Sequence, residues 1–267
     1  MLIVGFYQIN QKTTPRIAIV IPARLNSERL PNKALLQFFE LPMIEHVRRR
    51  GLLNSFGVPV FVATGDAEII DIVESLGGVV GRSQIQHFNG TSRVHEFSEL
   101  TDFTHFLILQ GDEILVLPDQ LDSIILSILA HPDVDFWNMV TPLNEIAELS
   151  NPSVVKCVLN QELDVLSIFR KSPLISEVET QIKLVHKICG LFAVSRKALS
   201  LMAKLSPTPL ETSESIEQLK FLELGYKIKS IMTPLSYPSI NLPEDVEIVW
   251  EILLTDNKQE EVLQKIL

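Results

Sequence analysis

The stretch IAIVIPARLNSERLPNK occupies residues 17–33 and joins an unbroken apolar run to a loop rich in basic and polar side chains. A short apolar run bounded by turn-forming residues is typical of a strand that is buried on both faces of a parallel sheet. We therefore expect a strand over residues 17–22, which delivers the following loop to one edge of that sheet.

Two further apolar runs, residues 58–63 (VPVFVA) and 105–110 (HFLILQ), have the same character as the first. Apolar residues at helical spacing follow each of them, and two more such stripes occur late in the chain. Their members are Ile69, Ile70, Val73 and Leu76; Leu121, Ile124, Ile125, Ile128 and Leu129; Ile216, Leu219 and Leu222; and Val246, Val249, Trp250 and Leu253. This alternation predicts an α/β fold with a mostly parallel sheet flanked by helices.

The pattern changes near Thr141, after which three β-like runs occupy residues 154–159, 165–169 and 188–195. We expect them to form a smaller antiparallel β subdomain, which is attached to the main core and does not fold separately. The predicted organisation is an N-terminal extension (residues 1–15), one domain (16–255) with a subsidiary lobe (about 142–195), and a C-terminal helical tail (256–267).

Composition limits the class of protein. The 267 residues are 46% hydrophobic and 21% charged, so the chain buries enough surface to fold without disulfides or zinc. A net charge of −10 argues against a nucleic-acid partner. Acidic residues interrupt the longest apolar stretch, residues 114–130, and no secretory signal is recognisable, so we expect a cytoplasmic protein with no membrane contact. Cys157 and Cys189 lack a metal-binding spacing and are interpreted as free thiols.

The loop after the first strand reverses the charge of the chain. Between Arg16 and Lys33 there are four basic residues and one acidic residue. Ligands of open parallel sheets bind beyond the carboxyl ends of the strands, where backbone amides and cationic side chains can hold a polyphosphate. The alternative is a solvated surface loop whose charges have no partner.

Gly111, Asp112 and Glu113 come directly after the third strand. Paired carboxylates at a strand end suit Mg²⁺, which combines carboxylates with water and substrate phosphates. The alternative is a turn in which Asp112 binds its own backbone. The sequence has no GxGxxG, GxxxxGK[ST], GxSxG or HExxH pattern, and its histidines lack zinc-ligand spacing.

Five segments together resemble the CMP-Kdo synthetases, the cytidylyltransferases that activate 3-deoxy-manno-octulosonate (Kdo). IPARLNSERLPNK (residues 21–33) is similar to the family's IPAR-x-x-S-x-R-L-P-x-K loop. NGTSR (89–93) resembles SGT-x-R, and QGDE (110–113) is identical to the family's segment. PLETSESIEQLKFLELGY (209–226) and SINLPED (239–245) resemble the late PLE-x-x-E-x-x-EQLR and VDTPED segments. The order of the segments is preserved over residues 16–253.

This resemblance implies Mg²⁺-dependent transfer of CMP from CTP to the anomeric hydroxyl of an acidic sugar, with release of pyrophosphate. It also implies a Rossmann-like nucleotidyltransferase fold and a homodimer formed through the section after Thr141. The catalytic residues that it implies are Arg24, Lys33 and Asp112. The implied nucleotide-binding residues are Ala23, Arg24, Ser27, Lys33, Thr91 and Arg93; the sugar-binding positions are Gln110, Glu217, Gln218, Ile188 and Phe192; and the metal ligands are Asp112 and Asn241.

Three departures from the family pattern concern the metal and the sugar. Asn241 occupies the position of an aspartate that is normally a second metal ligand, and its other interpretation is a turn residue before the helix that Pro243 starts. Ile188 and Phe192 occupy the positions of a histidine and a tyrosine that contact the sugar. VATGD at residues 62–66 replaces VATDD. Apolar groups where a pocket normally pairs with hydroxyls indicate a different or less hydroxylated acid.

Three functions therefore remain open from the sequence. The first is CMP transfer to Kdo or a related acidic sugar. The second is CMP transfer to another nonulosonic acid or to a phosphonate. The third is a catalytically silent paralogue that binds a nucleotide or a partner protein, which Asn241 favours and which Arg24, Lys33 and Asp112 oppose.

Overall fold

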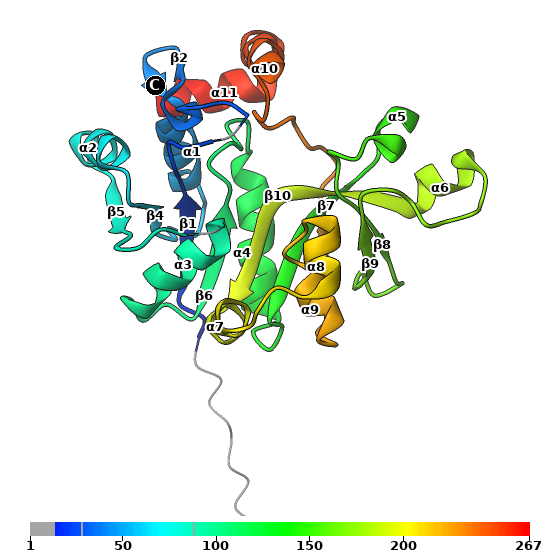
Figure 1. Cartoon of the computed structure of the whole chain (residues 1–267). Coiled ribbons are helices and arrows are strands. Elements are labelled where there is room, and N and C mark those ends of the chain that lie inside the picture. The colour runs from blue at the N-terminus through cyan, green and yellow to red at the C-terminus, as the bar shows by residue number, and fades with distance from the viewer. Residues whose placement is uncertain (1–13, 28, 88) are drawn as a thin grey trace, which may run out of the picture.

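The computed structural model describes residues 14–27, 29–87 and 89–267, so the predicted N-terminal extension lies almost wholly outside it. The central sheet has the strand order β11-β7-β10-β6-β1-β4-β5 (Figure 1). Only β10 runs antiparallel to its neighbours within this order, which confirms the mostly parallel sheet. The strands are β1 (Ile17–Pro22), β4 (Val60–Thr64), β5 (Val79–Arg82), β6 (His105–Leu109), β7 (Phe136–Pro142), β10 (Val185–Ser195) and β11 (Lys229–Met232).

Strand β1 has the bounds that its apolar run predicts, and all six of its residues are buried. Ile17, Ile19 and Ile21 join the hydrophobic cluster on one face of the sheet. Ala18 and Val20 join the cluster on the opposite face. Because side chains alternate across a strand, an unbroken apolar run is the pattern that burial on both faces requires.

Helices cover both faces of the sheet (Figure 1). On one face lie α1 (Met43–Leu52), α2 (Ala67–Ser75), α4 (Pro118–Ala130), α10 (Pro243–Thr255) and α11 (Asn257–Ile266). On the other lie α3 (Gly90–Glu99), α7 (Arg196–Lys204), α8 (Pro209–Glu214) and α9 (Leu219–Glu223). A short 3-10 helix, η1 (Lys33–Leu35), and a hairpin of β2 (Gln37–Phe38) and β3 (Leu41–Pro42) lie between β1 and α1.

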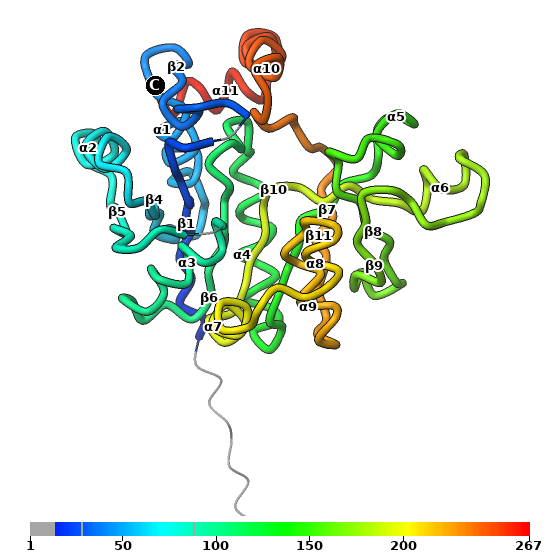
Figure 2. The backbone as a smooth tube through the Cα atoms, viewed as in Figure 1, coloured from blue at the N-terminus to red at the C-terminus, as the bar shows by residue number. Residues whose placement is uncertain are grey.

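The section after Thr141 forms a lobe that projects from one side of the molecule (Figure 2). It contains α5 (Ile146–Ser150), β8 (Lys156–Leu159), β9 (Val165–Phe169) and α6 (Val178–Leu184). The first residues of β10 pair with β8, and its later residues pair with β6 and β7. One long strand therefore connects the antiparallel lobe to the central sheet.

One predicted helix is shorter than its apolar stripe indicates. Leu219 and Leu222 lie in α9, which begins at Leu219, whereas Ile216 lies in the connection that follows the end of α8 at Glu214. Ser215 between them has a left-handed backbone with φ of 54°, which a continuing α-helix does not allow. Ile216 is still buried, because the connection turns its side chain into the core.

The C-terminal tail is helical and packs on its own chain. Val262, Leu263 and Ile266 of α11 belong to the same core cluster as β1. The Arg49 guanidinium on α1 donates to the carbonyl of Ile266 at 2.6 Å. None of the helices in the described ranges has both the length and the apolar character that crossing a bilayer requires.

Breaking a buried ion pair in α1 is expected to destabilise the fold strongly. Arg48 donates two hydrogen bonds of 2.7 Å to the Glu45 carboxylate, whose side chain is fully buried. Glu45→Ala leaves the Arg48 charge without its partner, so the free energy of unfolding should fall by about 3 kcal/mol or more. Urea denaturation measures this loss, and Glu68→Ala, at an exposed position of α2, is the control. Equal stability of the two variants would contradict the prediction.

Candidate active site

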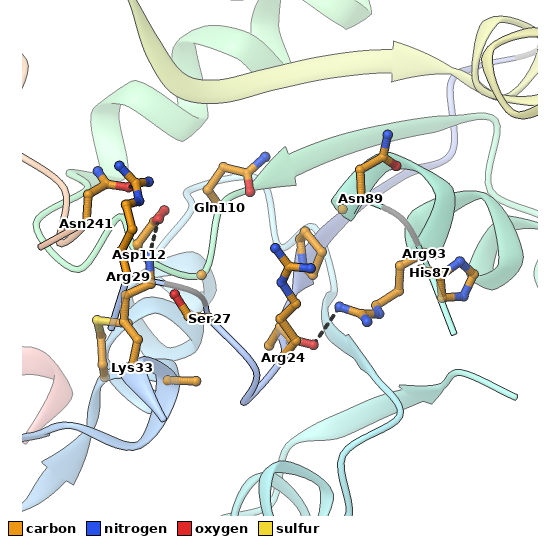
Figure 3. A pocket seen from close by; sticks show the side chains of 16 residues that line it. Arg24, Ser27, Arg29, Lys33, His87, Asn89, Arg93, Gln110, Asp112 and Asn241 are labelled. Carbon is orange, nitrogen blue, oxygen red and sulfur yellow. Dashed lines mark hydrogen bonds and ion pairs between the residues drawn. The ribbon is translucent and has the colours of Figure 1, made fainter. Parts of the chain in front are cut away.

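A cavity of about 320 Å³ lies at the carboxyl ends of β1 and β6 (Figure 3). The chain builds β1, β4 and β5 toward one edge and then returns to place β6 on the other side of β1. This reversal is the position where open α/β sheets bind ligands. The cavity is lined by Pro22, Ala23, Arg24, Ser27, Arg29, Lys33, Ala34, Met43, His87, Asn89, Gly90, Arg93, Gln110, Gly111, Asp112 and Asn241.

Positive charge dominates this cavity. Among the described residues, Arg24, Arg29, Lys33 and Arg93 line it together with a single carboxylate, that of Asp112. In a chain of net charge −10, such a local excess attracts an anion with several charges. The geometry therefore favours the polyphosphate interpretation of the loop after β1 over a solvated surface loop.

Lys33 connects three parts of the site. Its ammonium group donates to the Asp112 carboxylate at 2.7 Å and to the carbonyl of Ile240 at 2.8 Å. Its side chain is only 16% exposed, so the alternative of a solvated loop whose charges have no partner does not hold for Lys33. The contact fixes the end of η1 against the β6 turn and the segment that precedes α10.

Arg93 approaches the cavity from the first turns of α3. Its guanidinium donates to the carbonyl of Ala23 at 2.8 Å, which joins α3 to the loop after β1 (Figure 3). Burial lowers the pKa of Arg93, and its Nε has no hydrogen-bond partner within the described chain. A buried donor of this kind is available to a bound ligand.

The start of α3 lines the same cavity with Asn89 and Gly90. Asn89 caps the helix, because its side-chain oxygen accepts from the Ser92 amide at 2.8 Å. A Cβ atom at Gly90 would lie 3.1 Å from the Pro22 ring, so glycine permits the close approach of α3 to β1. The NGTSR segment therefore has a structural reason for its asparagine and its glycine.

The residues present fit Mg²⁺ only as a cation shared with a substrate. Asp112 lines the cavity, whereas no group of three His, Cys, Asp or Glu residues suited to a metal occurs in the described ranges. Mg²⁺ commonly takes one or two carboxylates and completes its shell with water and phosphate oxygens. The Asn241 amide oxygen also lies at this cavity, where it accepts from Arg29 at 3.0 Å.

Glu113 does not share the position of Asp112. Its carboxyl group points to the backbone of Gly190 on β10, and it does not line the cavity formed by the described residues. Burial and the neighbouring Asp112 charge raise the pKa of Glu113 to about 8. The two adjacent carboxylates are therefore separated in both direction and environment.

Thr91 and Glu217 line a second cavity of about 540 Å³, between α3, α7 and α8. Asn89 lines both cavities, so the second adjoins the first. The Glu217 carboxylate accepts a hydrogen bond from the Thr91 side chain, and burial raises the pKa of Glu217. The walls include the apolar side chains of Met202, Ala203, Leu205, Pro207 and Ile216.

The remaining predicted sugar positions lie in the core nearby. Phe192 is buried and stacks on Phe136, with ring centroids 5.5 Å apart. Ile188 packs against the same hydrophobic cluster. Gln218 accepts from the Asn138 side chain at 3.0 Å. None of Ile188, Phe192 and Gln218 is among the described residues that line the two cavities.

Eight residues that line the first cavity were not among the predicted site residues, namely Pro22, Arg29, Ala34, Met43, His87, Asn89, Gly90 and Gly111. Arg29 belongs to the loop motif, and Asn89 and Gly90 open the NGTSR segment, so their positions were available from the sequence. His87 follows an irregular segment, and its ring nitrogen lies 2.6 Å from the Glu96 carboxylate. No local pattern in the sequence marks it.

A cation-rich cavity at the reversal point of a doubly wound sheet defines a nucleotide-binding α/β protein. The chain belongs to the cytidylyltransferase family, whose model matches residues 18–230.

Two curated relatives span nearly the whole chain. The 3-deoxy-manno-octulosonate cytidylyltransferase of Chlorobium limicola is 36% identical, over 88% of this chain and 96% of its own length. The 8-amino-3,8-dideoxy-manno-octulosonate cytidylyltransferase of Shewanella woodyi is 33% identical, over 90% of this chain and 99% of its own. The family resemblance of the sequence motifs is thereby confirmed.

Solved structures agree on the fold. CMP:2-keto-3-deoxy-manno-octonic acid synthetase complexed with CTP superposes with a TM-score of 0.85, with 29% identity over 90% of this chain and 99% of that one. The inositol-1-phosphate CTP transferase of T. maritima has a TM-score of 0.63 at 18% identity, over 95% of this chain and 97% of that one, which shows a shared fold only.

Proposed function

We propose that the protein transfers CMP from CTP to the anomeric hydroxyl of Kdo or a related acidic sugar and releases pyrophosphate. The observation that carries this proposal is the cavity in which Arg24, Lys33 and Asp112 meet at the carboxyl ends of β1 and β6. The names of the relatives support the choice of nucleotide and of acceptor class.

In this reaction the acceptor hydroxyl oxygen attacks the α-phosphorus of CTP, and the bond to the β-phosphate oxygen breaks. Attack on a triphosphate is opposed mainly by its negative charge, so catalysis consists of positioning and neutralisation. Arg24, Arg29 and Lys33 provide fixed positive charge on one side of the cavity. Ala23 and Ser27 provide the loop that approaches the nucleotide, and Arg93 holds that loop against α3.

Mg²⁺ is the proposed cofactor, with Asp112 as its carboxylate ligand and Asn241 as a neutral amide ligand. Bound beside the triphosphate, Mg²⁺ offsets charge and aligns the phosphate oxygens. The Lys33 ammonium group already pairs with Asp112 at 2.7 Å, so Asp112 would be available to hold a cation if that ammonium group turned to a phosphate oxygen.

The acceptor is expected to contact the region between the two cavities. Gln110 lines the first cavity, Glu217 lines the second, and Gln218 lies beside Asn138 on β7. Ile188 and Phe192 provide no side-chain hydrogen bond, so this site pairs with fewer sugar hydroxyls than one with histidine and tyrosine. That difference keeps other nonulosonic acids and phosphonates as candidate acceptors.

Pyrophosphate release from CTP, measured against a panel of acids, tests the proposed function. The panel contains Kdo, 8-amino-Kdo, a nine-carbon nonulosonic acid and a phosphonate, each with CTP, UTP and ATP. Turnover with CTP and Kdo or its amino analogue is expected. If only the nonulosonic acid or only the phosphonate gives turnover, that compound takes the place of Kdo as the proposed acceptor. Binding of CTP without turnover on any acid would favour the silent paralogue.

Replacing Asn241 by aspartate is expected to lower the Mg²⁺ concentration that gives half-maximal activity. The added carboxylate lies at the cavity that contains Asp112, and a gain of about 1 kcal/mol corresponds to about a fivefold lower Mg²⁺ concentration at half-maximal activity. Calorimetric titration of Mg²⁺ into the enzyme with CTP provides a second measurement. Asn144→Asp, at an exposed position before α5, is the control. An unchanged titration would favour Asn241 as a turn residue only.

A homodimer is expected to form through the lobe after Thr141. This lobe exposes the apolar side chains of Ile146, Leu166, Ile175, Val178 and Leu184, which a second copy would cover. Light scattering should give about twice the chain mass of 30.1 kDa. Leu166→Asp with Ile175→Asp should shift the mass to that of one chain. A wild-type protein that elutes as a single chain at micromolar concentration would contradict this expectation.

A further inference from the structure

The backbone of Gly190 is held at both of its polar groups by one turn. Its amide donates to the Glu113 carboxyl group, and its carbonyl accepts from the Gln110 amide at 3.3 Å. The turn itself is closed by the Glu113 amide, which donates to the Gln110 carbonyl at 3.1 Å. The segment that carries Asp112 thus contacts β10 at Gly190.

The place of this attachment is an irregularity in β10. The pairing of β10 with β7 shifts register between Ile188 and Phe192, and the pairing with β6 begins only at Leu191. Gly190 therefore lies where β10 leaves the end of β6. Irregularities of this kind change the direction of side chains near active sites. A neighbouring group has to hold the irregular residue in place.

Close packing explains why residue 190 is a glycine. A Cβ atom at this position would lie 2.0 Å from Oε1 of Glu113 and 2.8 Å from its Cδ. No side chain fits there unless the Glu113 carboxyl group moves. The glycine is needed for this approach and not for a left-handed backbone, since the residues with positive φ do not include it.

We propose that Glu113 is a positioning residue, which fixes the β10 irregularity through Gly190 and so sets the acceptor side of the site relative to Asp112. The proposal rests on the proposed function. Gln110 lies at one end of the turn, and Ile188 and Phe192 flank the irregularity. A displaced Gly190 therefore moves the predicted sugar positions, whereas Lys33 and Arg93 are held by other contacts.

The alternative role for a carboxyl group beside Asp112 is that of a general base for the acceptor hydroxyl. The two roles differ in what the amide analogue can do. Glutamine still accepts the Gly190 hydrogen bond through its side-chain oxygen, but it cannot take a proton. Glu113→Gln therefore separates positioning from proton transfer, and Glu113→Ala removes both.

The experiment compares Glu113→Gln, Glu113→Ala, Gly190→Ala and the double variant. We expect Glu113→Gln to keep kcat and both KM values within about threefold of wild type. Glu113→Ala and Gly190→Ala should each raise the acceptor KM about tenfold or more, with the CTP KM changed less than twofold. The double variant should be no worse than Glu113→Ala, because the clash has gone.

Three results would overturn the proposal: loss of kcat in Glu113→Gln, equal changes of both KM values in Glu113→Ala, or additive effects in the double variant. Hydrogen exchange of the Gly190 amide gives a measurement that needs no turnover. Protection should be lost in Glu113→Ala and kept in Glu113→Gln. If wild type releases no pyrophosphate with any acceptor, the proposed function fails, and the exchange data alone decide the positioning role.

Discussion

Replacing Asp112 by asparagine is expected to lower kcat by at least about a thousandfold at every Mg²⁺ concentration. Asp112 is the only carboxylate among the described residues that line the cation-rich cavity. The substitution keeps the size of the side chain and its ability to accept a hydrogen bond, but it removes the negative charge that Asp112 offers to the cation. Because the asparagine oxygen can still accept from Lys33, the local fold should survive.

Pyrophosphate release over a Mg²⁺ titration measures this effect, and CTP binding measured separately shows that the cavity is intact. Asp119→Asn is the matched control, since Asp119 is exposed at the first turn of α4 and outside the cavity. Turnover of Asp112→Asn that recovers at high Mg²⁺ would make Asp112 one ligand among several. If Asp112→Asn has the same turnover as wild type, Asp112 is not a catalytic residue.

Replacing Lys33 by alanine is expected to weaken CTP binding and slow turnover together, by about a hundredfold in kcat/KM. The loss has two causes: a phosphate partner disappears, and the anchor between Asp112 and the carbonyl of Ile240 is broken. Since Lys33 is largely buried, the free energy of unfolding should also fall, by about 1 to 2 kcal/mol.

Calorimetry with CTP and a thermal midpoint separate the two effects of Lys33→Ala. Arg24→Ala should weaken CTP binding without the stability loss, because no hydrogen bond within the protein holds its side chain in the described ranges. Lys197→Ala, which removes an exposed ion pair with Asp135, is the control. Unchanged CTP affinity and unchanged turnover in Lys33→Ala would exclude Lys33 from the nucleotide site.

The sequence predicted those parts of the site that depend on neighbouring residues. The run at residues 17–22 became β1 with the same bounds, and the loop after it supplies the cations of the cavity. The family motifs located Arg93, Gln110 and Asp112 on elements that meet there. Each of these predictions uses a local pattern: apolar periodicity, turn residues after a strand, or a motif with fixed spacing.

The sequence did not predict which of its chemical groups face one another. Gly111, Asp112 and Glu113 look like one paired-carboxylate motif, yet Asp112 turns into the cavity and Glu113 turns to β10. Likewise, the family resemblance implied a sugar contact at Phe192, but the ring of this residue stacks in the core on Phe136. The direction of a side chain at a strand end depends on the register of the neighbouring strand, which no local pattern contains.

By itself, the sequence determined that this chain folds as an α/β protein with a basic loop at the end of its first strand. Hydrogen bonds between neighbouring residues and the periodicity of apolar side chains are sufficient to determine these local elements. They have the same effect wherever the segment lies in the fold. Only the tertiary structure decided that Lys33 meets Asp112, 79 residues away, and that Arg29 meets Asn241, 212 residues away. Those pairs exist because strand order brings distant loops to one edge of the sheet, and that order depends on how the whole chain packs.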